Sequence, residues 1–200
     1  MFDGQMRKVI DPPVNWIGRK LASIGITANA VTLAGLAIGL GAAAAIALES
    51  YLLGLILITL SRIADGLDGA VARATSTSDF GGYLDIVCDF LFYGAIPLAF
   101  AIAVPEANAV AAAFLITSFY FNGATFLGFA ILAEKKEMKT DARGTKSLYY
   151  TGGLLEGTET IAFFLALCLF PTWFAPLAYA FGALCFVTAT SRIMLASKVF

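Results

Sequence analysis

Residues 28–48 read ANAVTLAGLAIGLGAAAAIAL, a stretch without a single charged side chain. Because a helix that crosses a bilayer needs about 20 mostly apolar residues, this stretch predicts a membrane-spanning helix. Five more stretches have the same character, near 52–73, 81–104, 109–134, 148–170 and 173–195. We therefore expect an all-α integral membrane protein that forms a single domain over residues 1–200, with six transmembrane helices bundled between residues 28 and 195.

The composition agrees with a membrane location and excludes several functions. Hydrophobic residues make up 60% of the 200 residues and charged residues 14%, against about 45–50% and about 25% in soluble domains. The chain has no histidine, which excludes histidine-ligated metals and a Ser–His–Asp triad. The net charge is −1, so we expect no nucleic-acid partner, which would need a basic face.

The N-terminal arm, residues 1–27, lacks the apolar core of a secretory signal. Its apolar residues, among them Trp16, alternate with basic residues, which is typical of an amphipathic helix lying in the membrane interface. Pro12 and Pro13 suit the first turn of such a helix. A mobile polar tail is the alternative interpretation.

The basic residues predict the orientation of the bundle. With six spans, the far-side loops around residues 49–51, 105–108 and 171–172 contain no Lys or Arg. By the positive-inside rule, both termini are then cytoplasmic, in a bacterial-type inner membrane. The opposite side holds the following basic residues: Arg7, Lys8, Arg19, Lys20, Arg73, Lys135, Lys136, Lys139, Arg143, Lys146 and Lys198.

Four carboxylates lie inside the second and third predicted spans. A charged residue within a span costs about 2.5–3.5 kcal/mol, so such residues are expected to be functional. Asp65 and Asp68 are spaced i, i+3 and Asp85 and Asp89 i, i+4, so each pair shares one face of its helix. Both pairs are equally far from the polar turn 75–79, and in an antiparallel hairpin they lie at the same depth.

Carboxylates that converge in this way repel one another unless a cation neutralises them. Mg²⁺ is usually shared between carboxylates and substrate phosphates, and two such ions can clamp a phosphoryl group. Arg73 would then bind a phosphate oxygen. The alternatives are a buried ion network or a cation transporter, although a transporter predicts acidic groups spread along a path through the membrane.

At these residues the chain resembles the CDP-alcohol phosphotransferases, whose signature reads D-x2-D-G-x2-A-R, a spacer, then G-x3-D-x3-D. Every fixed position matches. The positions are Asp65, Asp68, Gly69, Ala72, Arg73, Gly81, Asp85 and Asp89. Residues 25–32 also resemble the family's Pro-Asn-x-hydrophobic-Thr segment, with Ala28 where proline is usual. In structural terms this segment is a helix start, with Thr27 or Asn29 as the cap.

The resemblance implies transfer of a phosphatidyl group from CDP-diacylglycerol to a small polar alcohol, with release of CMP. It implies two Mg²⁺ or Mn²⁺ ions bound by Asp65, Asp68, Asp85 and Asp89, with Asp89 also acting as the base. Many relatives are homodimers, so we expect a homodimer. The residues implied in CDP binding are Asn29, Thr32, Gly66, Asp68, Gly69, Ala72, Arg73 and Gly81.

The sequence says less about which alcohol is the acceptor. Members that use glycerol phosphate often carry an arginine where residues 33–37 here carry none, and members that use inositol phosphate carry basic residues where residues 126–134 and 155–160 here carry none. These regions instead contain or adjoin Asn122, Glu156 and Glu159, which hydrogen-bond alcohols or ammonium groups, whereas the two carboxylates repel phosphate. Interhelical polar contacts are the alternative role for these three residues.

We therefore expect a non-phosphorylated acceptor: inositol, or a serine-like or amine-bearing alcohol. Phosphatidylinositol-phosphate and phosphatidylglycerophosphate synthesis stay open as alternatives. Basic residues of the loop after the fourth span would rescue phosphate binding if that loop folded over the site. These residues are Lys135, Lys139, Arg143 and Lys146.

Overall fold

The computed structural model describes residues 3–136 and 157–200, with only the backbone of residues 3–11. Within these residues the regular structure is entirely helical. The helices are α1 (Asp3–Ser23), α2 (Ala28–Ala47), α3 (Tyr51–Ala74), α4 (Asp79–Ala103), α5 (Pro105–Lys135), α6 (Gly157–Leu169) and α7 (Phe174–Val199), with a short 3-10 helix, η2 (Pro171–Trp173), before α7.

The helices begin where the sequence supplies suitable residues. The Thr27 side chain accepts from the backbone N–H of Ala30 at 3.3 Å and caps α2. Ser78 caps α4 by accepting from Gly81 N–H at 3.0 Å. The turn between α3 and α4 therefore falls within the predicted polar segment.

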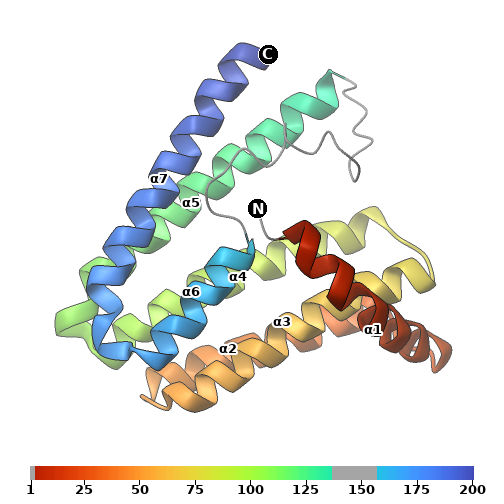
Figure 1. Ribbon diagram of the computed structural model, residues 1–200, viewed down its shortest axis with the longest axis horizontal. Helices are drawn as coiled ribbons and strands as arrows, with labels where there is room; N and C mark the ends of the chain where they lie inside the picture. The colour runs from red at the N-terminus through yellow and green to blue at the C-terminus, as the bar shows by residue number, and fades with distance from the viewer. Residues whose placement is uncertain (1–2, 137–156) are drawn as a thin grey trace.

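The packed pairs join helices that are adjacent in the sequence and helices that are distant in it. Helix α2 packs on α3 and α4, α4 on α5, and α6 on α3. Helices α5 and α7 pack side by side as a long pair, and α1 packs on the C-terminal half of α3 (Figure 1). The α3–α4 turn consequently lies near the end of the molecule where α1 and α2 meet.

A core of aromatic and aliphatic side chains joins these helices. Phe92, Phe100, Phe164 and Phe174 are fully buried, and the Phe100 and Phe174 rings stack with centroids 4.8 Å apart. Because lipid is as apolar as these side chains, close packing rather than water exclusion holds such helices together. Small residues permit that packing: a Cβ on Gly39 would lie 2.7 Å from Phe92 Cδ2.

Four segments of the described chain are long and apolar enough to cross a membrane: α2, α4, α5 and the unit Pro171–Val199. Helix α3 is long enough but carries Arg62, Asp65, Asp68 and Arg73. Helix α6 has only 13 described residues. The fold is thus that of a helical membrane protein, with four spans supported by length and composition.

The predicted spans agree with the helices to within a few residues where both are described. The span predicted at 148–170 corresponds to α6, and its residues 148–156 lie outside the described residues. The prediction that Pro12 and Pro13 open the N-terminal helix is wrong. Helix α1 begins at Asp3 and contains both prolines.

Candidate active site

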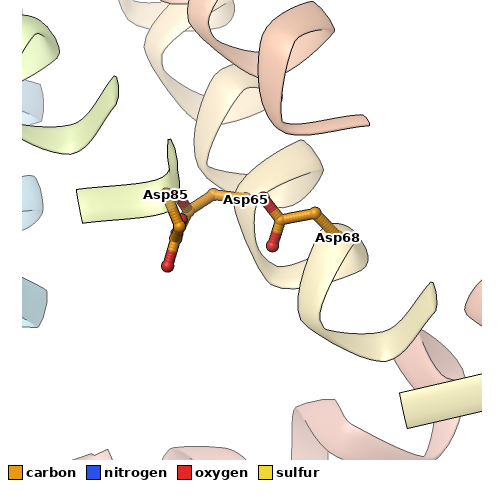
Figure 2. A group of neighbouring side chains, drawn as sticks. All are labelled: Asp65, Asp68 and Asp85. Carbon is orange, nitrogen blue, oxygen red and sulfur yellow. The ribbon is translucent and has the colours of Figure 1, made fainter. Parts of the chain in front are cut away.

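Three of the four predicted carboxylates come together where α3 and α4 face each other. One carboxylate oxygen from each of Asp65, Asp68 and Asp85 lies within 4.8 Å of the others. Figure 2 shows the Asp68 carboxylate of α3 turned toward those of Asp65 and Asp85. The i, i+3 spacing places Asp65 and Asp68 on one face of α3, and the hairpin brings Asp85 opposite them.

Helix α2 supports this cluster through Thr32. The Thr32 hydroxyl donates to Asp68 Oδ2 at 2.6 Å, and both residues are buried. A hydroxyl that donates to a carboxylate stabilises its charged form and fixes its orientation. Thr32, expected to contact the nucleotide, therefore also orients a carboxylate of the cluster.

Asp89 lies in a different setting. Arg62 Nη1 donates to Asp89 Oδ1 at 2.7 Å and lies 3.4 Å from Asp65 Oδ1. Asp89 is not part of the close group of three. Arg62 was not predicted as a site residue, although an arginine within a predicted span, one turn before Asp65, is a signal for such a role.

A cavity of about 480 Å³ opens beside the cluster. Six of the eight residues predicted to bind CDP line it: Asn29, Thr32, Asp68, Gly69, Ala72 and Gly81. Asp85 reaches it as well, so two of the three clustered carboxylates border this space. The cavity and the carboxylate cluster thus form one continuous site between α2, α3 and α4.

The other two predicted CDP-binding residues lie outside the cavity lining. A Cβ on Gly66 would meet nothing within 4 Å. The side chain of Arg73 is held by α1, because its Nη2 donates to Asn15 Oδ1 at 3.0 Å. Asn15 was not predicted as a site residue, and nothing in its local sequence indicated this contact.

Two loops whose residues were not predicted to bind CDP also line the cavity. Residues 25–28 border it before α2, and residues 75–78 border it at the α3–α4 turn. Gly25 has φ +84°, a conformation that side-chain-bearing residues rarely adopt. The run of hydroxyl side chains in the second loop could have indicated a phosphate-binding role, because hydroxyls donate to phosphate oxygens. The residues are Thr75, Ser76, Thr77 and Ser78.

The residues predicted to bind the acceptor are only partly described. Asn122 of α5 accepts from Arg192 Nη1 of α7, through its carbonyl at 3.0 Å and its Oδ1 at 2.9 Å. Glu159 lies in the first turn of α6. Glu156 lies outside the described residues.

The chemistry of the three clustered side chains fits a divalent cation. Mg²⁺ binds oxygen ligands at about 2.0–2.1 Å, so opposite ligands lie about 4.2 Å apart. The three carboxylate oxygens lie within 4.8 Å of one another, so small side-chain movements would suffice. Cys88, Cys168 and Cys185 are buried free thiols, and their scattered positions offer no comparable group.

An apolar helical bundle with a carboxylate cluster beside a cavity fits a membrane-embedded enzyme that acts on phosphate esters. The sequence model of the CDP-alcohol phosphatidyltransferase family matches residues 25–195, and the chain belongs to this family. It is therefore an integral membrane enzyme of the CDP-alcohol phosphatidyltransferase class. The predicted resemblance is confirmed, and the alternative of a cation transporter is not supported.

The relatives extend this result. The chain is 47% identical to the inner membrane protein YnjF of Escherichia coli (strain K12) over 193 residues, which cover 96% of this chain and 94% of that protein. It is 41% identical over 88 residues to the archaetidylinositol phosphate synthase of Pyrococcus horikoshii, covering 44% of this chain and 47% of that enzyme.

A solved structure shares the fold. The crystal structure of Mycobacterium tuberculosis phosphatidylinositol phosphate synthase with CDP-DAG bound superimposes with a TM-score of 0.57 and 22% sequence identity. The match covers 92% of this chain and 90% of that chain. At this level of identity the likeness concerns the fold of the bundle.

Proposed function

We propose that this protein transfers a phosphatidyl group from CDP-diacylglycerol to the hydroxyl of a small polar alcohol and releases CMP. The observation that carries the proposal is the cluster of Asp65, Asp68 and Asp85 beside a 480 Å³ cavity. Family membership supports the reaction class, and the related synthase of known structure has CDP-DAG bound.

The CDP moiety would occupy the cavity between α2, α3 and α4. A Cβ on Gly81 would lie 3.0 Å from Ser78 Oγ and 3.2 Å from Asn29 Oδ1, so glycine keeps this wall open. Gly69 and Ala72 line the cavity from α3 and, having little or no side chain, take up little of its space. The hydroxyls of the 75–78 turn would donate to phosphate oxygens.

Asp65, Asp68 and Asp85 would hold the metal, with Asp89 as a further ligand, and two Mg²⁺ or Mn²⁺ ions are the proposed cofactors. Such ions neutralise charge on a transferring phosphoryl group. Thr32 keeps Asp68 oriented toward the other two carboxylates. In this arrangement the protein supplies negative charge for the metals and polar hydroxyls for the nucleotide.

The chain's own contribution to the chemistry is the base. Asp89 takes the proton from the acceptor hydroxyl, whose oxygen forms a bond to the phosphorus next to the lipid. The bond from that phosphorus to the bridging oxygen breaks, and its electron pair leaves with CMP. Positioning dominates phosphoryl transfer, so a carboxylate is a sufficient base and the lack of histidine is no obstacle.

For the acceptor we propose a non-phosphorylated polyol or amino alcohol. Arg62, the cation beside Asp89, is already paired with Asp89 and Asp65. A phosphorylated acceptor would need a further cation close to the base. Asn122, Glu156 and Glu159 are proposed to hydrogen-bond the acceptor.

A second candidate is an acceptor that carries a phosphate, such as inositol phosphate. One feature favours it: the buried Arg192 guanidinium is bonded to neutral oxygens of Asn122 and Thr125, so its charge remains available to an anion. Both named synthases among the relatives make inositol phosphate lipids.

A panel of acceptors separates these candidates. Purified protein in lipid nanodiscs receives CDP-diacylglycerol, Mg²⁺ and one alcohol at a time, and released CMP is measured. We expect release with inositol, serine or an amino alcohol. Release only with inositol phosphate or glycerol phosphate contradicts the proposed acceptor, and Arg192→Met would then raise KM for that phosphate.

We further propose how the single domain, residues 1–200, sits in the membrane. Helices α3 and α6 complete six spans together with the four long apolar segments. Helix α1 lies in the membrane interface, because its Trp16 side chain is exposed and Lys20 Nζ lies 3.8 Å from the centre of the Trp16 ring. Both termini and the site face the cytoplasm of a bacterial-type inner membrane. The working unit is a homodimer.

A further inference from the structure

Arg62 is a charged residue within a proposed membrane span. It lies on α3, one helical turn before Asp65, and its side chain is only 10% exposed. Through the single atom Nη1 it contacts carboxylates of two helices, Asp89 of α4 at 2.7 Å and Asp65 of α3 at 3.4 Å. A buried arginine in a span is costly, so its retention calls for a role.

The guanidinium is fixed from other directions as well. Its Cζ lies 4.0 Å from the centre of the Phe92 ring, so the planar group stacks on an aromatic face. Arg62 Nη2 donates to Ser61 Oγ at 3.2 Å, and Ser61 Oγ donates to the Gly35 carbonyl at 2.8 Å. Since Phe92 and Ser61 are fully buried, the arginine is anchored to α2, α3 and α4 together.

The geometry therefore points to Arg62 as a positioning residue for Asp89. This inference rests on the proposed function, in which Asp89 takes the acceptor's proton. Arg62 holds Asp89 Oδ1, so the second carboxylate oxygen stays available to the acceptor hydroxyl. It also supplies positive charge between Asp89 and Asp65, which offsets the repulsion between these two carboxylates.

Lysine could not reproduce this arrangement. A guanidinium is planar and stacks on an aromatic ring while its two terminal nitrogens bond different partners. An ammonium is a compact point charge without a plane. Arg62→Lys keeps the charge but loses the simultaneous contacts with Phe92, Ser61 and Asp89, whereas Arg62→Met removes the charge as well.

The test compares wild type, Arg62→Lys and Arg62→Met as full-length proteins in nanodiscs, with the best acceptor from the panel. Thr59→Val is the control, because this exposed hydroxyl on the same helix bonds only the Leu55 carbonyl in its own turn. The number of folded sites is counted by Mn²⁺-dependent CDP binding, and kcat is expressed per site. Both KM values are measured in parallel.

We expect Arg62→Lys to lower kcat per site by about tenfold or more, the order of loss that follows from misplacing a reacting group. Both KM values should stay within about twofold of wild type, because the nucleotide cavity is unchanged. Arg62→Met should lose at least as much, and Thr59→Val should behave as wild type.

A loss confined to KM or to the number of CDP-binding sites would show a merely structural role and overturn the inference. So would an unchanged kcat per site in Arg62→Lys. If wild type itself releases no CMP with any acceptor, the proposed function fails instead, and the two failures are therefore distinguishable.

Discussion

At the scale of single residues, the four aspartates occupy two settings. Asp65, Asp68 and Asp85 form a close group, whereas Asp89 pairs with Arg62. Spacing alone could predict that all four lie on facing helix surfaces. It could not predict their separation, because that depends on Arg62 reaching across from α3 and stacking on Phe92, which are long-range contacts.

Replacing Asp89 tests its role as base. Asp89→Asn should lower turnover by about 10²–10⁴-fold, the usual contribution of general acid–base catalysis. Binding of CDP-diacylglycerol should stay close to wild type, because the cavity lining and the three clustered carboxylates are unchanged and asparagine keeps an oxygen at this position. CMP release and CDP-lipid affinity are measured on the same preparation. Normal turnover in this variant would show that Asp89 is not the base.

Replacing Asp68 tests the metal cluster. Asp68→Ala removes one of the three clustered carboxylates and the acceptor of the Thr32 hydroxyl. Mn²⁺-dependent CDP binding should weaken by about tenfold or more, the effect expected from losing a well-placed ligand. The control is Asp79→Asn, an exposed acid in the first turn of α4. Equal CDP affinity in the two variants would contradict the assignment.

At the scale of elements, hydrophobic stretches predicted the positions of helices closely. The segment expected at 52–73 is Tyr51–Ala74, and the one expected at 81–104 is Asp79–Ala103. Local signals explain this success, since Thr27, one of the two expected caps, caps α2, and Ser78 of the predicted polar turn caps α4. The length of α1 could not be read in this way, because prolines inside a helix are an exception to the local rule.

Helix contacts near the site depend on small residues. A Cβ on Gly39 of α2 would lie 2.7 Å from Phe92 Cδ2 and 2.9 Å from Ser61 Oγ. Gly39→Ala should therefore destabilise the bundle by about 1–3 kcal/mol, the usual cost of overpacking. In the matched control Gly41→Ala, the new Cβ meets only Leu57 Cδ1, at 3.9 Å.

The apparent Tm in detergent measures this difference between neighbouring glycines of one helix. We expect a lower Tm for Gly39→Ala and little change for Gly41→Ala. Equal Tm values for the two variants would show that α2 and α4 are not packed as closely as described.

At the scale of the whole molecule, the distribution of basic residues predicts orientation, and cysteine labelling tests it. The three native cysteines are buried, so an introduced exposed cysteine can be labelled selectively. The two variants are Glu106→Cys, at a position in the predicted far-side loop, and Ser76→Cys, at a position in the α3–α4 turn on the side of the site. A membrane-impermeant thiol reagent on intact spheroplasts should label the first and not the second. The reverse pattern would place the site on the outer side.

The composition could predict a membrane protein without histidine chemistry, and the aspartate motif could predict the enzyme class, which the family match confirms. It could not predict how α5 and α7 pair or how Arg192 bonds Asn122, because these contacts join residues 70 positions apart. For the same reason, the sequence predicts the acceptor less well than the nucleotide. The residues that would bind CDP lie in short motifs, whereas the residues that would bind the acceptor are brought together only by folding.

The most direct test of the central claim is acceptor-dependent CMP release from CDP-diacylglycerol, measured with and without divalent metal. The purified protein is stripped with EDTA, dialysed into nanodisc buffer, and assayed before and after addition of Mg²⁺ or Mn²⁺. We predict that CMP appears only when both an alcohol and a metal ion are present, and that activity returns on metal addition. Equal CMP release by the stripped protein, or none with any alcohol after metal is restored, would contradict the account.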